Sequence, residues 1–511
     1  MRIDLKRDAD SPLYRQIHAS ISRSIRSGGL PKGTRLPSVR AMSKELGVSL
    51  ITIVQAYDAL TADGLIHATV GRGTFVGSPS IVHLGSDLSE ETARTPESPG
   101  EGEWQTSLPV YLRSPRISEM ESRLKSARRP DVIYLASGTP DSTLFPVRAI
   151  GRIWHRAMVV EDPRYLQYGS PQGDANLRTW IAGHCSSLGI EARPEDILIT
   201  SGVQQAIDLV ARTFVGPGDY VLVESPTFLT ALDIFDGRGV KLMGVPVDAR
   251  GMKLDVAAML VGRFHPRMIY TIPTAQNPTG TTMNEERRRR LAELARQHNI
   301  LVLEDDSCSE FTYDSEAPPS IKAFDSGGHV IFVKGFSKTV VPGLRVGGVV
   351  AHGSIMSRLA ESKAVADRFS STLVQRTLWR YLSSRQYERD LEMARGVYRG
   401  RRDAMLRALE TYMPQDFTWT HPDAGFNLWV NLPKSISSPD AFEEGMKEGV
   451  ACGPGDLFLP HVPPPSGLRL SFADKPEHII AEGVRRLASA MLRLKDQEAT
   501  RSQETEFVTT I

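Results

Sequence analysis

Apolar residues near the start of the chain follow the spacing of a helix. Leu13, Ile17, Ile21 and Ile25 recur at every fourth position, which predicts one buried helix face. Ser11 and Pro12 suit the start of this helix, and Gly28-Gly29 suits its end. Two shorter helices are predicted after Pro37 and from about Ser49. The second helix directs Val39, Met42 and Leu46 inward, and the third carries Val54, Tyr57 and Leu60 as its apolar positions.

The pattern changes to a β type after Gly64, which stops the third helix. The runs LIHATV and TFV are rich in β-branched and aromatic residues and are separated by Gly71, Arg72 and Gly73, which predicts a hairpin. Three helices followed by a hairpin form a winged helix-turn-helix. We therefore expect a DNA-binding domain over residues 1–78.

A second pattern begins at about Ile133, where short β-branched runs alternate with helical stretches such as 285–298. This alternation is typical of an α/β domain whose mostly parallel sheet is covered by helices on both faces. The expected strands are 196–200, 220–224, 240–245, 267–272, 300–305, 330–333 and 345–350.

Beyond about Ser370 the pattern becomes long helical segments followed by two strands, 426–432 and 468–472. This predicts a smaller α+β lobe. We expect one large domain over 116–496, with a large lobe at about 133–370 and a small lobe at about 371–496. Residues 497–511 are predicted to be a polar, frayed tail.

Residues 79–115 are rich in Ser, Pro, Glu and Gly, without lasting periodicity, and are predicted to be a flexible linker. Charge also changes sign there. Residues 1–78 carry 11 Lys and Arg against 6 Asp and Glu, whereas six acidic residues face only Arg94 between Pro79 and Pro109. A basic head before an acidic linker favours DNA contact at the head, although a solvated basic face would look the same.

Composition narrows the class of protein. The chain has 511 residues, of which 41% are hydrophobic and 24% charged, and its net charge is only +1. Its three cysteines show no metal-ligand spacing, so we expect free thiols and no metal site. No apolar run approaches the roughly 20 residues that cross a bilayer, and the N-terminus lacks a signal-peptide core. We therefore expect a cytoplasmic protein without a membrane partner.

The predicted head offers several groups that suit DNA. Ser49 and Thr52 begin the third helix and can hydrogen-bond phosphate or base edges, while Arg35 and Arg40 can neutralise phosphates. Arg72, at the hairpin tip, can reach the duplex. Each residue alone has a structural alternative, since Ser49 can be only a helix cap and an exposed arginine is usually solvated.

The whole stretch from SPLYRQIHAS to GRGTFV resembles the GntR family of bacterial regulators. The resemblance implies a DNA-binding face made of Arg35, Ser38, Arg40, Ser49, Thr52, Arg72 and Gly73. One position departs from the family, which commonly has Arg where this chain has Leu50. Leucine cannot donate to guanine but can pack on a thymine methyl group, so the operator is expected to differ.

Lys338, in VKGFSKTVVPGLRVGG, is a candidate for chemistry in the larger domain. A lysine amine forms a Schiff base with an aldehyde if burial or nearby cations keep part of it neutral. Most lysines are surface charges, so its companions along the chain decide the interpretation. Arg345 follows at a strand start and suits a phosphate.

Other residues fit the same ligand. Asp305 ends an apolar strand, where a carboxylate points into the usual crevice and can keep a pyridine nitrogen protonated. Asn277, in PTAQNPTG, can donate to a ring oxygen, and Phe228 can stack on the ring. Ser201-Gly202-Val203-Gln204 joins a strand to a helix whose N-terminus suits phosphate. Arg469 can clamp a carboxylate. In isolation a loop cap, a core phenylalanine or a surface arginine would each be the more usual interpretation.

Together these segments resemble the fold-type I enzymes that use pyridoxal 5′-phosphate (PLP), specifically class I aminotransferases, from about Leu135 to Leu492. The matching segments are YLQYGSPQGDANLR, SGVQQAIDL, PTAQNPTG, FSKTVVPGLRVG and LRLSFA. The resemblance implies that Lys338 forms the internal aldimine. It also implies that Asp305 holds the pyridine nitrogen, Asn277 the ring oxygen and Arg469 the amino-acid carboxylate. Phe228 would stack on the ring, Val203, Gln204, Ser337 and Arg345 would hold the phosphate, and Tyr168 would reach the partner subunit's cofactor.

Three departures concern this site. The enzymes usually have a Tyr two or three residues after the aspartate, where this chain has Ser307 and Cys308, and often a hydroxyl where Val203 and Gly335 stand. PLP binding should survive, because the lysine, aspartate and arginine remain. The departures leave undecided whether the electronic properties of the cofactor remain adjusted for transamination.

A GntR-type head on an aminotransferase-like body resembles the MocR subfamily of regulators. The resemblance implies a homodimeric transcription regulator whose body senses an amino compound, or PLP itself, through Lys338. The main alternative is a working PLP-dependent aminotransferase with a DNA-binding head. A third alternative is a constitutive regulator whose body only dimerises, which the intact ligand residues argue against.

Overall fold

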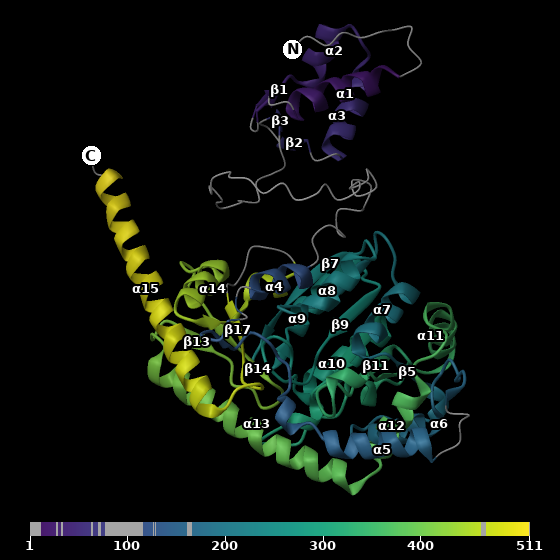
Figure 1. Ribbon diagram of the computed structural model, residues 1–511. Helices are drawn as coiled ribbons and strands as arrows, with labels where there is room; N and C mark the ends of the chain where they lie inside the picture. The colour runs from purple at the N-terminus through teal and green to yellow at the C-terminus, as the bar shows by residue number, and fades with distance from the viewer. Residues whose placement is uncertain are drawn as a thin grey trace. The chain divides into compact units, whose positions relative to one another are not determined.

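The computed structural model describes residues 12–26, 29–31, 34–62, 65–69, 73–76, 116–125, 127, 129–160, 166–460 and 467–509 (Figure 1). The chain divides into a first unit, residues 1–109, and a second, residues 110–511. The linker predicted over 79–115 lies outside the described residues.

The first unit contains the predicted three helices and hairpin. The helices are α1 (Leu13–Arg26), α2 (Val39–Leu46) and α3 (Leu50–Ala62). The sheet has the order β1-β3-β2, with β1 (Arg35–Leu36) and β2 (Ile66–Thr69) both antiparallel to β3 (Gly73–Val76). The buried core of this unit consists of Ile17, Ile21, Leu36, Met42, Ile53, Ala56, Tyr57, Leu60, Ile66 and Val76.

Local hydrogen bonds define the start of α2 and tie α3 to it. The Ser38 side chain caps α2 by accepting from the Ala41 amide, and Gly47 ends the helix with a φ of 63°, which favours glycine. The Tyr57 hydroxyl donates to the Pro37 carbonyl at 2.8 Å and so ties α3 to the start of α2. Of the apolar positions expected in the third helix, Tyr57 and Leu60 are buried, but Val54 is exposed.

The second unit is built on an eight-stranded sheet of order β5-β12-β11-β10-β9-β6-β7-β8. The central strands pair parallel to one another in the order β7, β6, β9, β10, β11. Strand β12 is antiparallel to both of its neighbours. All seven strands expected in the large lobe are therefore present. Their bounds are β5 Ile197–Thr200, β6 Tyr220–Ser225, β7 Lys241–Asp248, β8 Gly251–Met252, β9 Met268–Thr271, β10 Leu301–Asp306, β11 Val330–Gly335 and β12 Gly347–Val350.

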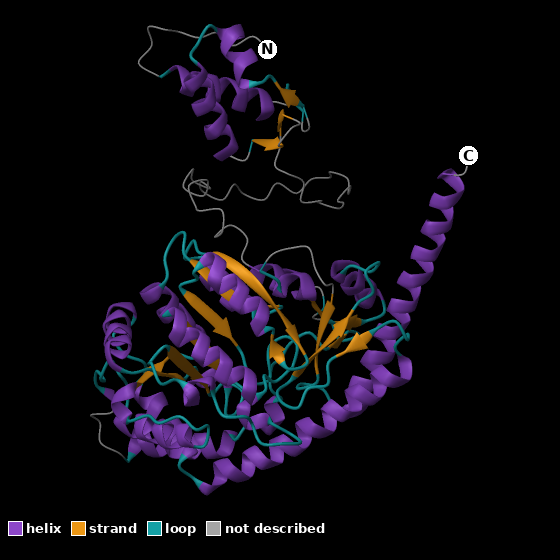
Figure 2. Cartoon of the chain, turned by 180° about the vertical axis from the view of Figure 1, so that it is seen from behind, coloured by secondary structure: helices purple, strands orange, loops and turns teal. Residues whose placement is uncertain are grey.

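Helices cover both faces of this sheet (Figure 2). On β6, Val221 and Val223 join one buried cluster and Leu222 joins another, because successive side chains of a strand point to opposite faces. This burial on both faces explains the continuous apolar strand sequences. The helices are α5 Val147–Val159, α6 Ala175–Ser186, α7 Val203–Phe214, α8 Leu229–Asp236, α9 Leu254–Phe264, α10 Glu285–His298, α11 Gly353–Ala366 and α12 Thr372–Leu382.

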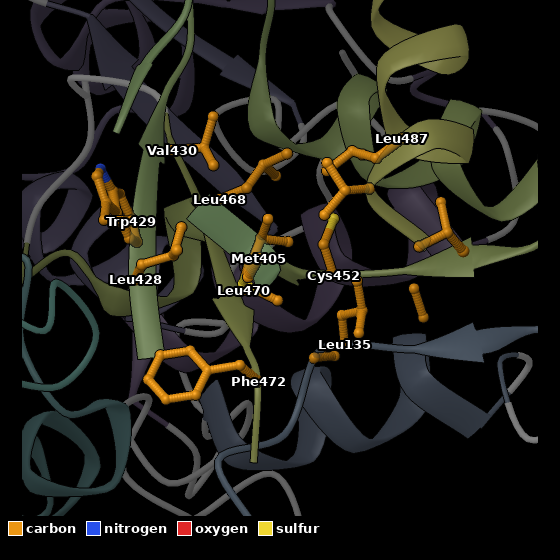
Figure 3. Packing of buried hydrophobic residues seen from close by; sticks show 14 of the residues in the cluster. Leu135, Met405, Leu428, Trp429, Val430, Cys452, Leu468, Leu470, Phe472 and Leu487 are labelled. Atoms are coloured by element: carbon orange, nitrogen blue, oxygen red, sulfur yellow. The ribbon is translucent and has the colours of Figure 1, made fainter. Parts of the chain in front are cut away.

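The small lobe is a four-stranded sheet packed on helices, with the order β13-β14-β17-β16. Leu428 and Val430 of β14, Leu468 and Leu470 of β17, and Met405 of α13 belong to its buried cluster (Figure 3). The elements are α13 Arg385–Tyr412, α14 Ser438–Lys447, α15 Glu477–Thr509, β13 Thr418–Trp419, β14 Asn427–Asn431, β16 Gly453–Pro454 and β17 Gly467–Ser471.

The lobe boundaries differ from those expected from the pattern. Strand β4 (Ile133–Tyr134), placed at the start of the large lobe, pairs with β15 (Val450–Ala451) of the small lobe. Helix α12, placed in the small lobe, packs with α5 and α6 in a cluster of the large lobe. The chain passes from one lobe to the other twice. Helices and strands have the same hydrophobic spacing in both lobes, so the sequence pattern does not show where the chain passes between them.

The expected frayed tail is also different. Helix α15 continues without a break through residues 497–509 to Thr509. The segment DQEATRSQETE contains no Gly or Pro and is rich in good helix formers, so helix propensity extends the element even though its residues are polar. Among the described residues, no helix has the length and apolarity needed to cross a bilayer.

Candidate functional sites

A cavity of about 400 Å³ lies at the carboxyl ends of the parallel strands and is lined by both lobes. Ligands of open α/β sheets bind at this edge. Nine of the ten residues predicted for the cofactor and the carboxylate line the cavity. These are Val203, Gln204, Phe228, Asn277, Asp305, Ser337, Lys338, Arg345 and Arg469.

Two lysines of neighbouring segments differ sharply in their surroundings. Lys334, on β11, is fully buried and pairs with Asp306 at 2.9 Å and Glu310 at 2.8 Å. These carboxylates raise the pKa of Lys334 against the effect of burial, so its amine stays protonated.

Lys338 follows the end of β11 and has no ion pair among the described residues; its Nζ donates to the Gly138 carbonyl at 2.5 Å. Burial lowers the pKa of Lys338, and the cations Arg469 and Arg345 lower it further, against the effect of Cys308. A neutral amine is the nucleophilic form. Lys334 is therefore held as a paired cation, whereas Lys338 is buried near cations that favour its neutral form.

Asp305 stands at the end of β10 with only 3% of its surface exposed. Tyr270 donates its hydroxyl to one carboxylate oxygen at 2.9 Å, and Ser307 donates to the other at 3.1 Å. Burial raises the pKa of Asp305 to about 6, although both hydrogen bonds oppose the rise. A cationic ring nitrogen beside this carboxylate would favour its ionised form.

The departures at Ser307, Val203 and Gly335 are coupled in space. A side chain at Gly335 would place its Cβ 2.7 Å from Val203 Cγ2 and 3.1 Å from Ser307 Oγ. The Val203 side chain thus occupies the room that a hydroxyl-bearing residue at position 335 would need. The Cys308 thiol lines the same cavity, and burial raises its pKa to about 12, so it is protonated at neutral pH.

The anion end of the cavity combines a helix start with an arginine. Helix α7 begins after Gly202, which has a φ of 89° and provides no side-chain cap, so the first N–H groups of the helix remain for a ligand. A Cβ at Gly202 would lie 2.9 Å from Arg345 Nη2, so the missing side chain makes room for the guanidinium. Arg345 Nη1 donates to Ser337 Oγ at 3.4 Å.

The opposite end is organised by Arg469 on β17, which is 7% exposed. Its guanidinium donates to Asn277 Oδ1 at 3.1 Å and to the Ala136 carbonyl, and it lies 4.7 Å from the centre of the Phe458 ring. Burial lowers the pKa of Arg469 to about 10. The bond to Arg469 uses the amide oxygen of Asn277, which leaves its NH₂ as the group that can donate to a ligand.

Helix α4 (Arg116–Lys125), the first described element after the linker, forms a wall of the cavity through Ile117, Met120 and Leu124. Arg116 pairs with Asp233 at 3.3 Å and with Asp236 at 2.5 Å, both on α8 of the large lobe.

Arg123, near the other end of α4, pairs with Asp456 of the small lobe at 3.0 Å. One short helix is therefore fastened to both lobes and to the cavity. The sequence pattern of α4 contained no signal for this position.

Tyr168 is the one predicted cofactor residue that does not line the cavity. It is 75% exposed, beside Phe369 and under the guanidinium of Arg368. Its predicted role toward a partner subunit stays a prediction.

Sequence reasoning missed two residues of the site, Tyr270, which bonds Asp305, and Asn427, which lines the cavity. Tyr270 was not singled out because it lies on a different strand, 35 residues before its partner Asp305. Asn427, on β14, has a buried Oδ1 without a partner among the described residues. Its side chain lies against Gly138, where an added Cβ would be 3.1 Å from that oxygen. An asparagine at the start of an apolar strand was the available signal.

The predicted DNA face is partly described. Arg35, Ser38 and Ser49 are exposed and Thr52 is half-buried. The Ser49 and Thr52 hydroxyls bond each other at 2.8 Å, and Ser49 caps α3 by accepting from the Thr52 amide. The side chain of Arg40, the residue Arg72 and the exposure of Gly73 lie outside the described residues.

The cavity fits pyridoxal phosphate by its own chemistry. It presents an amine whose pKa burial lowers, a buried carboxylate and an anion cradle. Two of its buried polar atoms, Arg469 Nε and Asn427 Oδ1, have no partner among the described residues. Unpaired buried groups at a site cost stability unless a ligand satisfies them. When bound, the cofactor supplies an aldehyde for an amine and an electron-withdrawing ring.

Two family models match the chain. Residues 130–487 match aminotransferase class I and II, and residues 13–76 match the gntR family of bacterial regulatory proteins. The chain is 31% identical over 88% of its length to the uncharacterized HTH-type transcriptional regulator YisV of Bacillus subtilis strain 168, of which it covers 90%. It is 28% identical, over 97% of both chains, to the probable rhizopine catabolism regulatory protein MocR of Rhizobium meliloti.

Among solved structures, the body is similar to the α-aminoadipate aminotransferase LysN of Thermus thermophilus, complexed with N-(5′-phosphopyridoxyl)-L-leucine. The TM-score is 0.71 and the identity 32%, and the match covers 77% of this chain and 99% of that one. The family match and this phosphopyridoxyl complex indicate pyridoxal phosphate as the cofactor.

Proposed function

Because this chain belongs to the class I and II aminotransferase family over residues 130–487 and to the gntR family over residues 13–76, we propose that it is a MocR-type transcription regulator whose PLP-binding body senses an amino compound. One observation carries the proposal. Lys338, Asp305, Arg345 and Arg469 line one cavity in a chain that also has a winged helix-turn-helix.

In this proposal each residue of the cavity binds a different part of the cofactor or of the amino compound. Lys338 binds the cofactor aldehyde, and Asp305, held by Tyr270 and Ser307, faces the ring nitrogen. Arg345, Ser337 and the first turn of α7, with Val203 and Gln204, hold the phosphate. Asn277 and Phe228 position the ring, and Arg469 takes the carboxylate of the amino compound.

Helix α4 provides a route from ligand to linker. It contacts the cavity through Met120 and Leu124, and its ion pairs reach both lobes through Arg116 and Arg123. A ligand that changes the spacing of the lobes must break or move one of these attachments. Because α4 directly follows the linker in the chain, such a movement shifts the point from which the linker to the DNA-binding head begins. Ligand and DNA then bias the same equilibrium.

We propose a homodimer, since α5 and the described residues that follow it up to Tyr168 carry several exposed apolar side chains. Val147, Met158, Val159, Val160, Leu166 and Tyr168 are each at least 47% exposed. Grouped exposed apolar residues mark association surfaces. Leu166→Asp should lower the mass measured by sedimentation to that of one chain, whereas Met259→Asp, at an exposed apolar position on α9, should leave it unchanged.

A working aminotransferase is the second candidate, favoured by the 32% identity to LysN and by the intact Lys338, Asp305 and Arg469. The two candidates differ in product. A sensor shows a lasting spectral change with an amino acid and forms little keto acid, whereas an enzyme forms keto acid at a steady rate.

The deciding experiment uses the full chain with PLP, a duplex from its own upstream region and a panel of amino compounds. We expect at least one compound, or PLP itself, to change the duplex affinity by about 5-fold or more, the usual lower range of coupling between sites. Keto-acid formation is followed in the same samples. A chain that binds no duplex, or whose affinity ignores PLP and every compound, contradicts the proposal.

A further inference from the structure

The outer face of α3 is apolar at the end where a helix of this type enters DNA. Leu50 is 48% exposed and Val54 is 42% exposed. Residues four apart lie on the same side of a helix, so the two side chains form one continuous apolar surface.

The core of the first unit does not use this surface. Ile53, Ala56, Tyr57 and Leu60 of α3 are buried and belong to the core cluster, which does not include Leu50 or Val54. Leu50 and Val54 are thus not partly exposed members of the core-facing side of α3.

The two hydroxyl groups at the start of α3 are already engaged. The Ser49 and Thr52 hydroxyls bond each other, and Ser49 also caps the helix. The sequence of α3, LITIVQAYDALTA, contains no Lys or Arg. The bidentate cation contact to guanine, the commonest specific contact in the major groove, is therefore not available from this helix.

Thymine offers the chemistry that this surface matches, because its C5-methyl group is the one apolar feature of the major groove. We propose that Leu50 and Val54 read thymine methyl groups, so that the half-site under the start of α3 is specified by thymines. Exposed basic residues outside α3, such as Arg35, contribute attraction to phosphates that does not depend on sequence. This inference rests on the proposed function, since it takes duplex DNA as the partner.

The test removes one methyl group at a time from DNA. Full-length protein first selects its preferred duplex from a random pool, and each thymine of that site is then replaced by deoxyuridine, which keeps the base pair and loses the methyl group. We expect at least one replacement to weaken binding by about fourfold, the effect of exposing one buried methyl-sized group. The same replacement should change binding by less than about 1.5-fold in Leu50→Ala or Val54→Ala, because the apolar partner of the methyl group is then gone.

Two further variants complete the design. Leu50→Arg should lose the dependence on the methyl group and select guanine at that position instead. Thr61→Ala, at an exposed position near the other end of α3, should keep the wild-type response to deoxyuridine. Since Leu50 and Val54 are exposed, these variants should fold, which circular dichroism checks.

The outcomes separate the two proposals. If selection retains a specific duplex whose deoxyuridine forms all bind as tightly as the parent, or if the penalty persists in both alanine variants, methyl reading is wrong while the regulator proposal stands. If no duplex is retained at all, both fail.

Discussion

The head and the body of this protein bind by opposite designs. In the body, the candidate ligand groups are buried and hold one another, as Tyr270 and Ser307 hold Asp305 and as Arg469 holds Asn277. In the head, the candidate groups Arg35, Ser38 and Ser49 are exposed, and the core cluster of this unit does not include them. A small ligand needs a preorganised, water-poor pocket, whereas a duplex is read by side chains that stand out from a surface.

This difference predicts how each region responds to mutation. Changes in the cavity should have large effects on cofactor, stability or ligand, because the groups are buried and share partners. Changes on the head should affect DNA alone and in small steps.

The largest expected effect is at Lys338. Lys338→Ala should abolish the visible absorbance of lysine-bound PLP, because no other described lysine lines the cavity. Lys434→Ala, at an exposed position, should keep it. An unchanged spectrum in Lys338→Ala would reject the cofactor assignment. Binding to duplex DNA in the absence of ligand should remain, because the head folds around its own core.

The next effect concerns stability and pH. Burial raises the pKa of Asp305 to about 6 from 3.8. Between these two pH values the cofactor-free folded protein keeps a proton on Asp305 that the unfolded chain releases. The stabilisation is present below about pH 4 and is lost as pH rises through 6, amounting to about 3 kcal/mol.

Asp305→Asn should remove this share of the pH dependence and leave the share of Glu224, whose pKa burial raises to about 7. Unfolding of the cofactor-free protein in urea at pH 4 and pH 7 measures it, with the exposed Asp255→Asn as control. If wild type and Asp305→Asn lose equal stability between these pH values, the burial of an ionisable carboxyl at this position is contradicted.

A smaller effect, of about 50- to 100-fold, is expected at Arg469. Arg469→Ala should weaken the response to an amino-acid effector by this factor, as expected when one partner of a buried charge contact is lost. PLP should remain bound, because Lys338 and Arg345 are untouched. A full response from this variant, measured by titration of the absorbance change, would mean that the effector has no carboxylate held there.

The smallest effect is expected on the head. Arg40→Ala should weaken duplex binding by about five- to tenfold and lower the slope of log affinity against log salt by about one. The spectrum of bound PLP should not change. Equal affinity for wild type and variant across salt concentrations would remove Arg40 from the DNA face.

The sequence predicted the elements whose apolar or helical pattern extends over many residues. It missed elements that are too short for a pattern or whose residues are polar. Strand β10 was expected because ILVLED is a continuous apolar run, and α10 because its helical pattern is long. The two-residue pairing of β4 with β15 has no period to detect. The extension of α15 was missed because polarity outweighed the helix propensity of its last residues.

The same distinction holds for the cavity. Lys338, Asp305 and Asn277 stand in recognisable segments, and the structure brings them to one cavity. The Val203 side chain fills the room beside Gly335, a residue far from it in the chain. The ion pairs of α4 with both lobes likewise depend on tertiary packing. Neither leaves a local trace, because the sequence near each residue is set by its own helix or loop.

The central claim is that one ligand event in the body changes DNA binding by the head. It is tested most directly by measuring duplex affinity of the PLP-loaded full chain before and after adding the amino compound that shifts its visible spectrum. We predict a change of at least about fivefold in wild type and none in Lys338→Ala. Equal affinity with and without a compound that demonstrably alters the spectrum would contradict the claim.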